Sequence, residues 1–281
     1  MTLTVFLVVI LAAALHAVWN ALVKGGQDKT LNMSAVVVGQ GLSGLACLPF
    51  VATPAPESWP WIALSIVLHI GYQLFLIGAY RIGDLTQVYP IARGTAPMLV
   101  AAISILILGV ELSTLETIGV LLIGAGIISL WLVRQSDGLR NPKAALLAFI
   151  TGCFIAGYSL VDGYGARLAG TAVGFYAVSA LGNAVVFALA MGAARPRLIR
   201  DLPKAWRTIA LGGGASFIAY ALVVWGFTEA PIALVTALRE TSIIFALLIG
   251  VIFLKERLDI WKVLSTAVTI VGAALLRLSK G

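Results

Sequence analysis

The sequence predicts an all-α integral membrane protein with ten transmembrane helices, arranged as two inverted five-helix repeats. Three observations predict this class: an apolar composition, ten long apolar runs, and an internal repeat. Of the 281 residues, 60% are hydrophobic and 11% are charged, whereas soluble domains have about 45–50% apolar and about 25% charged residues. No Lys or Arg precedes the first apolar run, so we expect a retained membrane helix there rather than a signal peptide.

Ten apolar runs are long enough to be spanning helices, which need about 20 residues. The runs cover residues 3–23, 32–51, 61–80, 86–108, 116–133, 143–163, 171–193, 205–228, 232–254 and 260–278. Transmembrane β-strands need only about 9–11 residues, so runs of this length indicate helices rather than a barrel.

The Lys and Arg residues between these runs predict the orientation. With ten helices both termini lie on one side, which carries only Arg167, Arg277 and Lys280, against fourteen Lys and Arg on the other side. The positive-inside rule then places both termini outside a multi-pass protein of the cell inner membrane. The net charge of +7 is explained by topology and contacts with the lipid bilayer, and it does not indicate nucleic-acid binding.

An internal repeat divides the chain into two predicted domains, residues 1–135 and 141–281. A shift of 146 residues places Arg93 on Arg239, Thr95 on Thr241 and Gly126 on Gly272. Because each half contains an odd number of predicted helices, the second half must enter the membrane with the opposite orientation. Inverted repeats of this kind are typical of secondary transporters with a binding site near the membrane midplane.

Three stretches carry a resemblance to a known family. They are LHAVWNALVKG in the first run, YPIARGTAPMLVA followed by Gly109-Val110-Glu111, and ALVTALRETSIIFALLIGVIFLKERL in the second half. In these stretches the chain resembles the drug/metabolite transporter superfamily, of the EamA type, with Glu256 at the position of the family's Gly-Glu motif. The resemblance implies a fold of two five-helix repeats and export of amino acids, metabolites or drugs. Lys255 departs from it, since the family often has Gly there, and so does the predicted orientation, since relatives commonly have their termini inside.

Arg93 and Arg239 are the most informative residues because a charged side chain within the bilayer costs at least about 2.5–3.5 kcal/mol. One interpretation is that the two guanidinium groups bind an anionic group of the substrate, most simply a carboxylate, as a bidentate fork. The alternative is that either arginine pairs with Glu240 and holds helices together. Glu240 is itself a candidate for proton coupling, because burial disfavours the charged form of a carboxyl group.

The run 86–108 contains a predicted hinge at Pro90, Gly94 and Pro97. Each proline removes one helical hydrogen bond, and a broken or kinked helix at membrane depth is tolerated where it lines a cavity. A kink that serves only packing is the alternative. Tyr89 lies one turn before Arg93 on the same face of this helix.

Further candidates for the substrate cavity are polar or aromatic residues within the apolar runs. They are His16, Trp19, Asn20, Gln73, Tyr158, Tyr220 and Trp225. Helix–helix hydrogen bonding and ordinary packing are the alternative roles for these residues, as they are for His69, which precedes Gln73 by one turn. For Asp162, near the end of its run, we expect an interfacial ion pair with Arg167.

These features favour a transporter over an enzyme or a channel. The chain has no G-x-x-x-x-G-K-[ST], no H-E-x-x-H and no G-x-S-x-G, so we expect no ATP-driven step, no catalysis, no metal and no cofactor. A channel usually builds its pore by symmetry among subunits, whereas two repeats in one chain need no partner. We therefore expect a monomer, with a homodimer as the alternative.

The predicted function is export of a small amphipathic or zwitterionic metabolite by alternating access, an amino acid being the first candidate. A multidrug or organic-anion exporter is the alternative. We expect the cavity to be lined by the runs 3–23, 61–80, 86–108, 143–163, 205–228 and 232–254. The runs 116–133 and 260–278 are expected to brace the two halves.

Overall fold

The computed structural model describes residues 1–24, 28–83, 85–133, 141–252 and 260–279, and these residues form helices with no strand. In the first half the helices are α1 (Leu3–Lys24), α2 (Lys29–Cys47), α3 (Trp59–Ile82), α4 (Leu85–Leu106) and α5 (Thr114–Val133). In the second half they are α6 (Pro142–Ala169), α7 (Ala172–Ala194), α8 (Pro196–Asp201), α9 (Gly214–Glu229), α10 (Ile232–Arg239), α11 (Ser242–Ile252) and α12 (Ile260–Leu278). A π-helical turn, Thr208–Gly213, leads into α9.

Seven of the described segments are long and apolar enough to cross a bilayer. They are Leu3–Asn20, Thr30–Phe50, Pro56–Ile82, Pro142–Ala169, Ala172–Ala194, Thr208–Glu229 and Ile232–Ile249. Three shorter apolar helices, Ile91–Leu106, Thr114–Ser129 and Val263–Leu278, lie at the other three predicted positions. The chain is therefore an all-α, multi-pass membrane protein.

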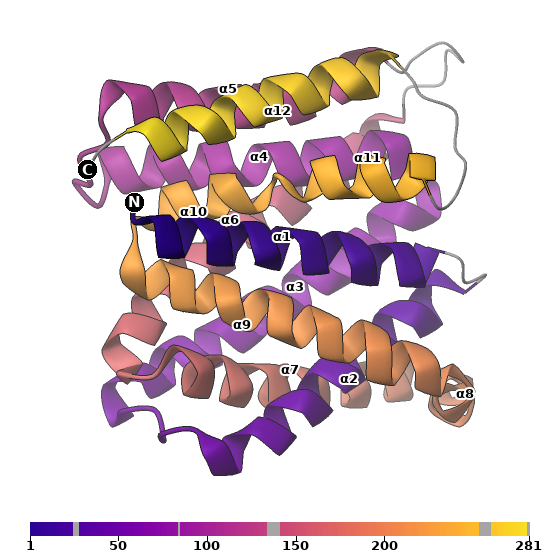
Figure 1. Cartoon of the computed structure of the whole chain (residues 1–281). Coiled ribbons are helices and arrows are strands. Elements are labelled where there is room, and N and C mark those ends of the chain that lie inside the picture. Colours follow the sequence, from indigo (N-terminus) through magenta and orange to yellow (C-terminus); the bar gives the residue numbers. More distant parts are fainter. Residues whose placement is uncertain (25–27, 84, 134–140, 253–259, 280–281) are drawn as a thin grey trace.

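The helices form a bundle with two outer pairs and a middle group (Figure 1). The pair α5 and α12 forms one edge, and the pair α2 and α7 forms the opposite edge. Helices α1, α3, α4, α6, α9, α10 and α11 lie between these pairs. Helix α1 begins and α12 ends at the same end of the bundle.

Local sequence signals set several helix ends. The side chains of Asp28, Asn141 and Thr171 accept hydrogen bonds from backbone N–H groups in the first turns of α2, α6 and α7, which is the usual role of an N-cap residue. Gly170 ends α6 with φ +67°, in the left-handed conformation that glycine adopts without a steric penalty.

The packing between helices recurs in corresponding pairs. Helix α3 packs on α6. Helix α9, which is the third long helix of the second half as α3 is of the first, packs on α1. Helix α4 packs on α5 and α6, as the α10–α11 segment packs on α12 and α1. The outer pairs, α5 with α12 and α2 with α7, join the first half of the chain to the second.

Small residues allow these helices to approach closely. A side chain on Gly41 or Gly44 of α2 would collide with Ala184 or Ala177 of α7. In the other outer pair, the hydroxyl of Ser265 on α12 donates to the carbonyl of Gly126 on α5. Close backbone approach through small residues is a main source of helix association in lipid.

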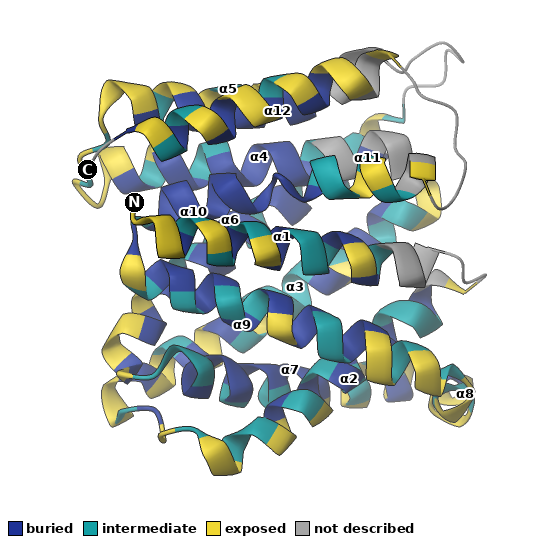
Figure 2. Cartoon of the chain, viewed as in Figure 1, coloured by how far each residue is buried: buried dark blue, intermediate teal, exposed yellow. Residues whose placement is uncertain are grey.

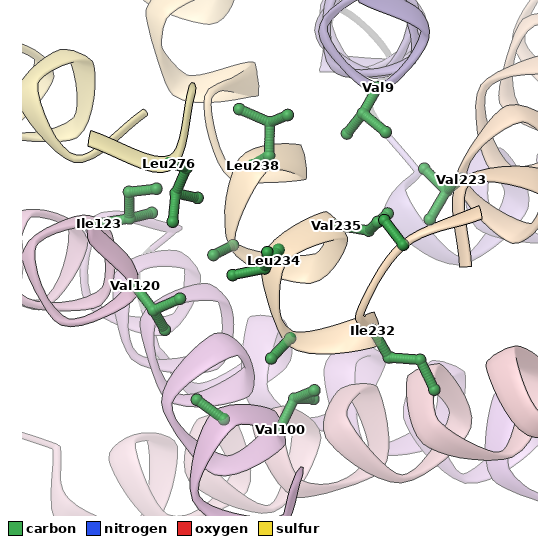
Figure 3. Close-up of a cluster of buried hydrophobic side chains, with 14 of the residues drawn as sticks. Val9, Val100, Val120, Ile123, Val223, Ile232, Leu234, Val235, Leu238 and Leu276 are labelled. Atoms are coloured by element: carbon green, nitrogen blue, oxygen red, sulfur yellow. The ribbon is translucent and has the colours of Figure 1, made fainter. Parts of the chain in front are cut away.

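Helix α10 lies at the centre of the largest apolar cluster, and all eight of its residues are buried. Figure 3 shows it between Ile123 and Leu276 on one side and Val9 and Val223 on the other. The outer faces of the bundle, in contrast, expose large apolar side chains such as Leu189 and Leu211 (Figure 2). Such a surface fits a lipid surrounding rather than water.

Helix α4 runs without a break through Pro90, Gly94 and Pro97. The hinge expected at these residues therefore stays a prediction in its other form, a kink within a continuous helix. One proline removes only one ladder bond, and α4 is held along its length by α5 and α6. Gly94 faces α5, where an added Cβ would meet Ile128. A helix interruption lies instead between α10 and α11.

We predict that Gly39→Ala lowers the thermal stability of the protein. An added Cβ on Gly39 would lie 2.8 Å from the Cα of Gly213 and still closer to the backbone of Ile209, so helix backbones must separate. Overpacking of this kind costs about 1–3 kcal/mol. The measurement is the unfolding midpoint in detergent. Gly78→Ala is the matched control, because its Cβ would meet only the Leu147 side chain at 3.7 Å; equal midpoints for the two variants would contradict the prediction.

Candidate functional site

A buried ion pair joins α4 to the junction of α10 and α11. Arg93 Nε lies 2.8 Å from Glu240 Oε2, and Arg93 Nη2 donates a weaker hydrogen bond to Ser242 Oγ at 3.4 Å. Only 7% of Arg93 and 1% of Glu240 is exposed. Arg93 thus has the structural partner that the sequence left as an alternative.

The second arginine is differently placed. Arg239 is only 3% exposed, its Nε lies 3.7 Å from Glu240 Oε1, and its Cζ lies 5.8 Å from the centre of the Tyr220 ring. Its Nε and Nη2 atoms are buried without a hydrogen-bond partner. Glu240 thus approaches Arg239 only at ion-pair distance, and neither of these two donor atoms makes a hydrogen bond within the described residues.

The interruption between α10 and α11 sets the positions of Arg239 and Glu240. Around Glu240 the backbone N–H groups bond three residues back instead of four, as in Thr241 N to Leu238 O (3.1 Å) and Ile243 N to Glu240 O (3.1 Å). The Thr241 hydroxyl also donates to Leu238 O. Arg239 ends α10, and Glu240 lies just before α11. A cation at a helix C-terminus and an anion at a helix N-terminus are both favoured by the helix dipoles.

A second polar cluster lies beside the arginines. The carboxyl group of Asp162 on α6 contacts His69 Nε2 of α3 at 3.0 Å and accepts a hydrogen bond from the Tyr220 hydroxyl of α9 at 2.8 Å. The expected pair of Asp162 with Arg167 is wrong. Arg167 instead donates to the carbonyls of Phe227 and Ala230, at the end of α9.

Aromatic rings surround this cluster. His69 stacks on Tyr158 at 4.1 Å and meets Tyr220 edge-on at 5.5 Å. Tyr72 contacts Tyr158, and Tyr176 contacts Tyr220 at 4.9 Å. Of these residues the sequence identified Tyr158 and Tyr220 for the cavity. It gave no sign of Tyr72 and Tyr176, which lie among many apolar residues.

The two clusters form one polar region. Tyr220 joins them, because its ring lies 5.8 Å from Arg239 Cζ and its hydroxyl donates to Asp162. His16 of α1 lines a small pocket together with Tyr220 and Arg239. The region is built from α1, α3, α4, α6, α9 and the α10–α11 junction, which correspond to the six runs expected to line the cavity. Within the described part of the chain, no group of His, Cys, Asp and Glu is suited to hold a metal ion.

The remaining residues predicted for the cavity differ in their surroundings. His16 and Trp19 have ring centres 5.1 Å apart, while the Asn20 amide donates to the backbone carbonyl of His16 within the same helix. Gln73 is buried, with no hydrogen-bond partner for Oε1. Trp225 packs against the apolar cluster around α10. The side chains of Tyr89 and Pro90 lie outside the described residues.

A small pocket adjoins the polar region in this conformation. It is lined by Ala12, His16, Ala219, Tyr220, Val223 and Arg239. Its volume of about 10 Å³ is near the least that holds one water molecule. Helices must therefore move before an organic substrate can occupy this pocket.

The fold and the buried charges together define a multi-pass helical membrane protein with a polar interior. Residues 142–278, in the second half of the chain, match the EamA-like transporter family. This match favours a transporter over an enzyme.

Two individual similarities extend the comparison. The chain is 33% identical over 122 residues to a "Probable terminal-alkyne amino-acid exporter" of Streptantibioticus cattleyicolor, and the match covers 43% of this chain and 38% of that protein's length. A solved crystal structure superposes with a TM-score of 0.80 at 21% identity, covering 99% of both chains. That likeness shows that nearly the whole chain shares its fold with the solved structure.

We predict that Glu240 is energetically coupled more strongly to Arg93 than to Arg239. Double-mutant cycles would combine Glu240→Gln with Arg93→Met or with Arg239→Met, and measure unfolding free energies in detergent. Residues in direct contact couple by about 0.5–3 kcal/mol, so we expect the Arg93 pair, at 2.8 Å, near the top of that range and the Arg239 pair, at 3.7 Å, near the bottom. Equal couplings would show that Glu240 is shared evenly.

Proposed function

We propose that this transporter exports a small metabolite, with an amino acid as the first candidate, across a bacterial inner membrane. The observation that carries the proposal is Arg239, a buried guanidinium group with two donors that have no hydrogen-bond partner. A buried donor without a partner costs about 1–3 kcal/mol, and more when the group is charged. A carboxylate that enters as a bidentate acceptor relieves this cost.

Arg93 and Glu240 have a supporting role in this proposal. Because their ion pair is already formed at 2.8 Å, they hold the α10–α11 junction in place, and Arg239 meets the substrate. Glu240 stays a candidate for proton coupling, since its Oε1 is buried without a hydrogen bond. The name of the matched relative, an amino-acid exporter, also supports a substrate with a carboxylate.

Alternating access is the proposed mechanism. Residues 1–135 and 141–281 serve as two inverted repeats, and the corresponding contacts of α3 with α6 and of α9 with α1 support this relation. The narrow pocket at Arg239 fits an occluded state. Rocking one repeat against the other opens such a site to either side of the membrane in turn.

The proposed unit is a monomer in the lipid bilayer, because both repeats are present in one chain. An organic-anion or multidrug exporter is the second candidate, and the unbonded donors of Arg239 favour the organic-anion case. Transport of amino acids against organic anions without an ammonium group distinguishes the two.

We predict that Arg239→Met lowers exchange of the carried substrate roughly 10-fold to 100-fold, as expected for losing charge-assisted hydrogen bonds of about 1.5–3 kcal/mol. Arg239→Lys should lower it less, because lysine keeps the charge but lacks the planar fork. The measurement is counterflow of labelled amino acids in proteoliposomes. Arg200→Met, on exposed α8, is the matched control; wild-type exchange by Arg239→Met would refute the assignment.

We predict that α8 faces the cytoplasm and that the opposite end of the bundle faces outside. In a Cys47→Ala, Cys153→Ala background, a membrane-impermeant maleimide should label Glu57→Cys in intact cells. It should label Ile199→Cys, whose native side chain is 56% exposed, only after the cells are permeabilised. The reverse pattern would place the termini inside.

A further inference from the structure

One side chain connects Arg239 to a buried carboxyl group. The ring of Tyr220 lies 5.8 Å from the Arg239 guanidinium, and its hydroxyl donates to Asp162 Oδ2 at 2.8 Å. Asp162 is fully buried. The Arg239 guanidinium therefore lies at the ring of Tyr220 and the Asp162 carboxyl group at its hydroxyl, within one polar region.

Only half of the Asp162 carboxyl group has partners. His69 Nε2 and the Tyr220 hydroxyl both meet Oδ2, whereas Oδ1 is buried with no hydrogen-bond partner. A carboxylate offers acceptor positions on both oxygens, and a buried acceptor that is left open is costly. The position thus favours a ligand that brings N–H donors to Oδ1.

The surroundings of Asp162 suit a cationic donor. Tyr158 and Tyr220 have ring centres 5.8 Å apart in an edge-to-face arrangement, and His69 contacts both rings. Faces of such rings attract ammonium groups through their quadrupoles, most strongly when water is excluded. The same rings shield the carboxyl group from lipid.

The charges of the region leave one positive and one negative group available. Glu240 lies 2.8 Å from Arg93 Nε but 3.7 Å from Arg239 Nε, so Arg239 is the more weakly paired cation. Asp162, whose contacts are His69 and Tyr220, is the acidic group on the other side of Tyr220. A purely anionic or cationic ligand would satisfy one of them and leave the other buried and open. A zwitterion satisfies both and adds no net charge to a site of low dielectric constant, where unpaired charges are costly.

We propose that Asp162, positioned by His69 and Tyr220, is a subsite for the substrate's ammonium group, while Arg239 receives the carboxylate. The substrate class is then the zwitterionic α-amino acids. This inference rests on the proposed function, which by itself requires only a carboxylate at Arg239.

The experiment uses the full chain in proteoliposomes at equal pH on both sides. The liposomes are loaded with the twenty proteinogenic L-amino acids and with the matching 2-hydroxy acids, which carry a hydroxyl in place of the ammonium group. Efflux is followed by mass spectrometry after subtraction of the rate from protein-free liposomes. The proteins compared are the wild type, Asp162→Asn and Ser159→Ala. Ser159 is the matched control, since it is also fully buried on α6 but bonds within its own helix.

The wild type is expected to export at least one amino acid at least tenfold faster than its 2-hydroxy acid. Asp162→Asn should lower amino-acid efflux about tenfold or more, as expected for losing a hydrogen bond to a charged group, and should bring the ratio of the two rates close to one. Ser159→Ala should keep the wild-type ratio. A purely structural role of Asp162 would instead slow both substrates equally, which overturns the assignment.

The possible failures are distinguishable. If wild-type protein releases no amino acid above the protein-free rate, the proposed function itself fails, and this inference fails with it. If the wild type carries an amino acid and its 2-hydroxy acid at equal rates, only the ammonium subsite is refuted, and that result needs no variant to fold. An Asp162→Asn protein that keeps the preference for the ammonium group also refutes it, and indicates that Asp162 serves another purpose, such as proton coupling.

Discussion

The buried ion pair between Arg93 and Glu240 is the interaction on which the rest of the interior depends. Removing one partner of such a pair leaves an uncompensated charge at a cost of several kcal/mol, so the chain must keep α4 and the α10–α11 junction within 2.8 Å contact. A continuous helix through residue 240 would lack the two extra helix ends found there. The interruption supplies a C-terminus beside Arg239 and an N-terminus beside Glu240, and both ends favour the charge placed at them.

The Arg93–Glu240 ion pair explains how a polar site can lie within a tightly packed apolar bundle. The apolar residues of α10 are buried among apolar side chains of α1, α4, α5, α9 and α12, which fixes the junction in the middle of the bundle. Glycine and alanine contacts let the outer pairs pack closely, with the Ser265 hydroxyl bonded across α5 and α12. Arg93, Arg239, Glu240 and Asp162 share one internal region, where Arg239 and Asp162 retain atoms without hydrogen-bond partners. In a lipid-embedded protein, such open atoms are the ones that a substrate can stabilise by binding.

Neighbours along the chain are a poor guide to contacts in space. Pro90 and Pro97 each remove a local hydrogen bond, yet α4 is one continuous helix that packs on α5 and α6. Asp162 and Arg167 are close in sequence, yet Arg167 reaches the free carbonyls at the end of α9. The partners of Asp162 are His69, 93 residues away, and Tyr220, 58 residues away, and no local pattern links these positions.

The sequence by itself determined the membrane environment, the helical class and the presence of two arginines inside apolar segments, because composition and run length report directly on the solvent that a chain requires. It also identified His16, Tyr158, Tyr220 and Glu240 as members of the polar interior, since polar groups within such runs are costly unless they have partners. The tertiary structure alone decided which helix is interrupted, that Glu240 pairs with Arg93, and that Tyr220 connects Arg239 to Asp162. These outcomes depend on distances between helices that are remote in sequence, and hydrophobic periodicity carries no information about them.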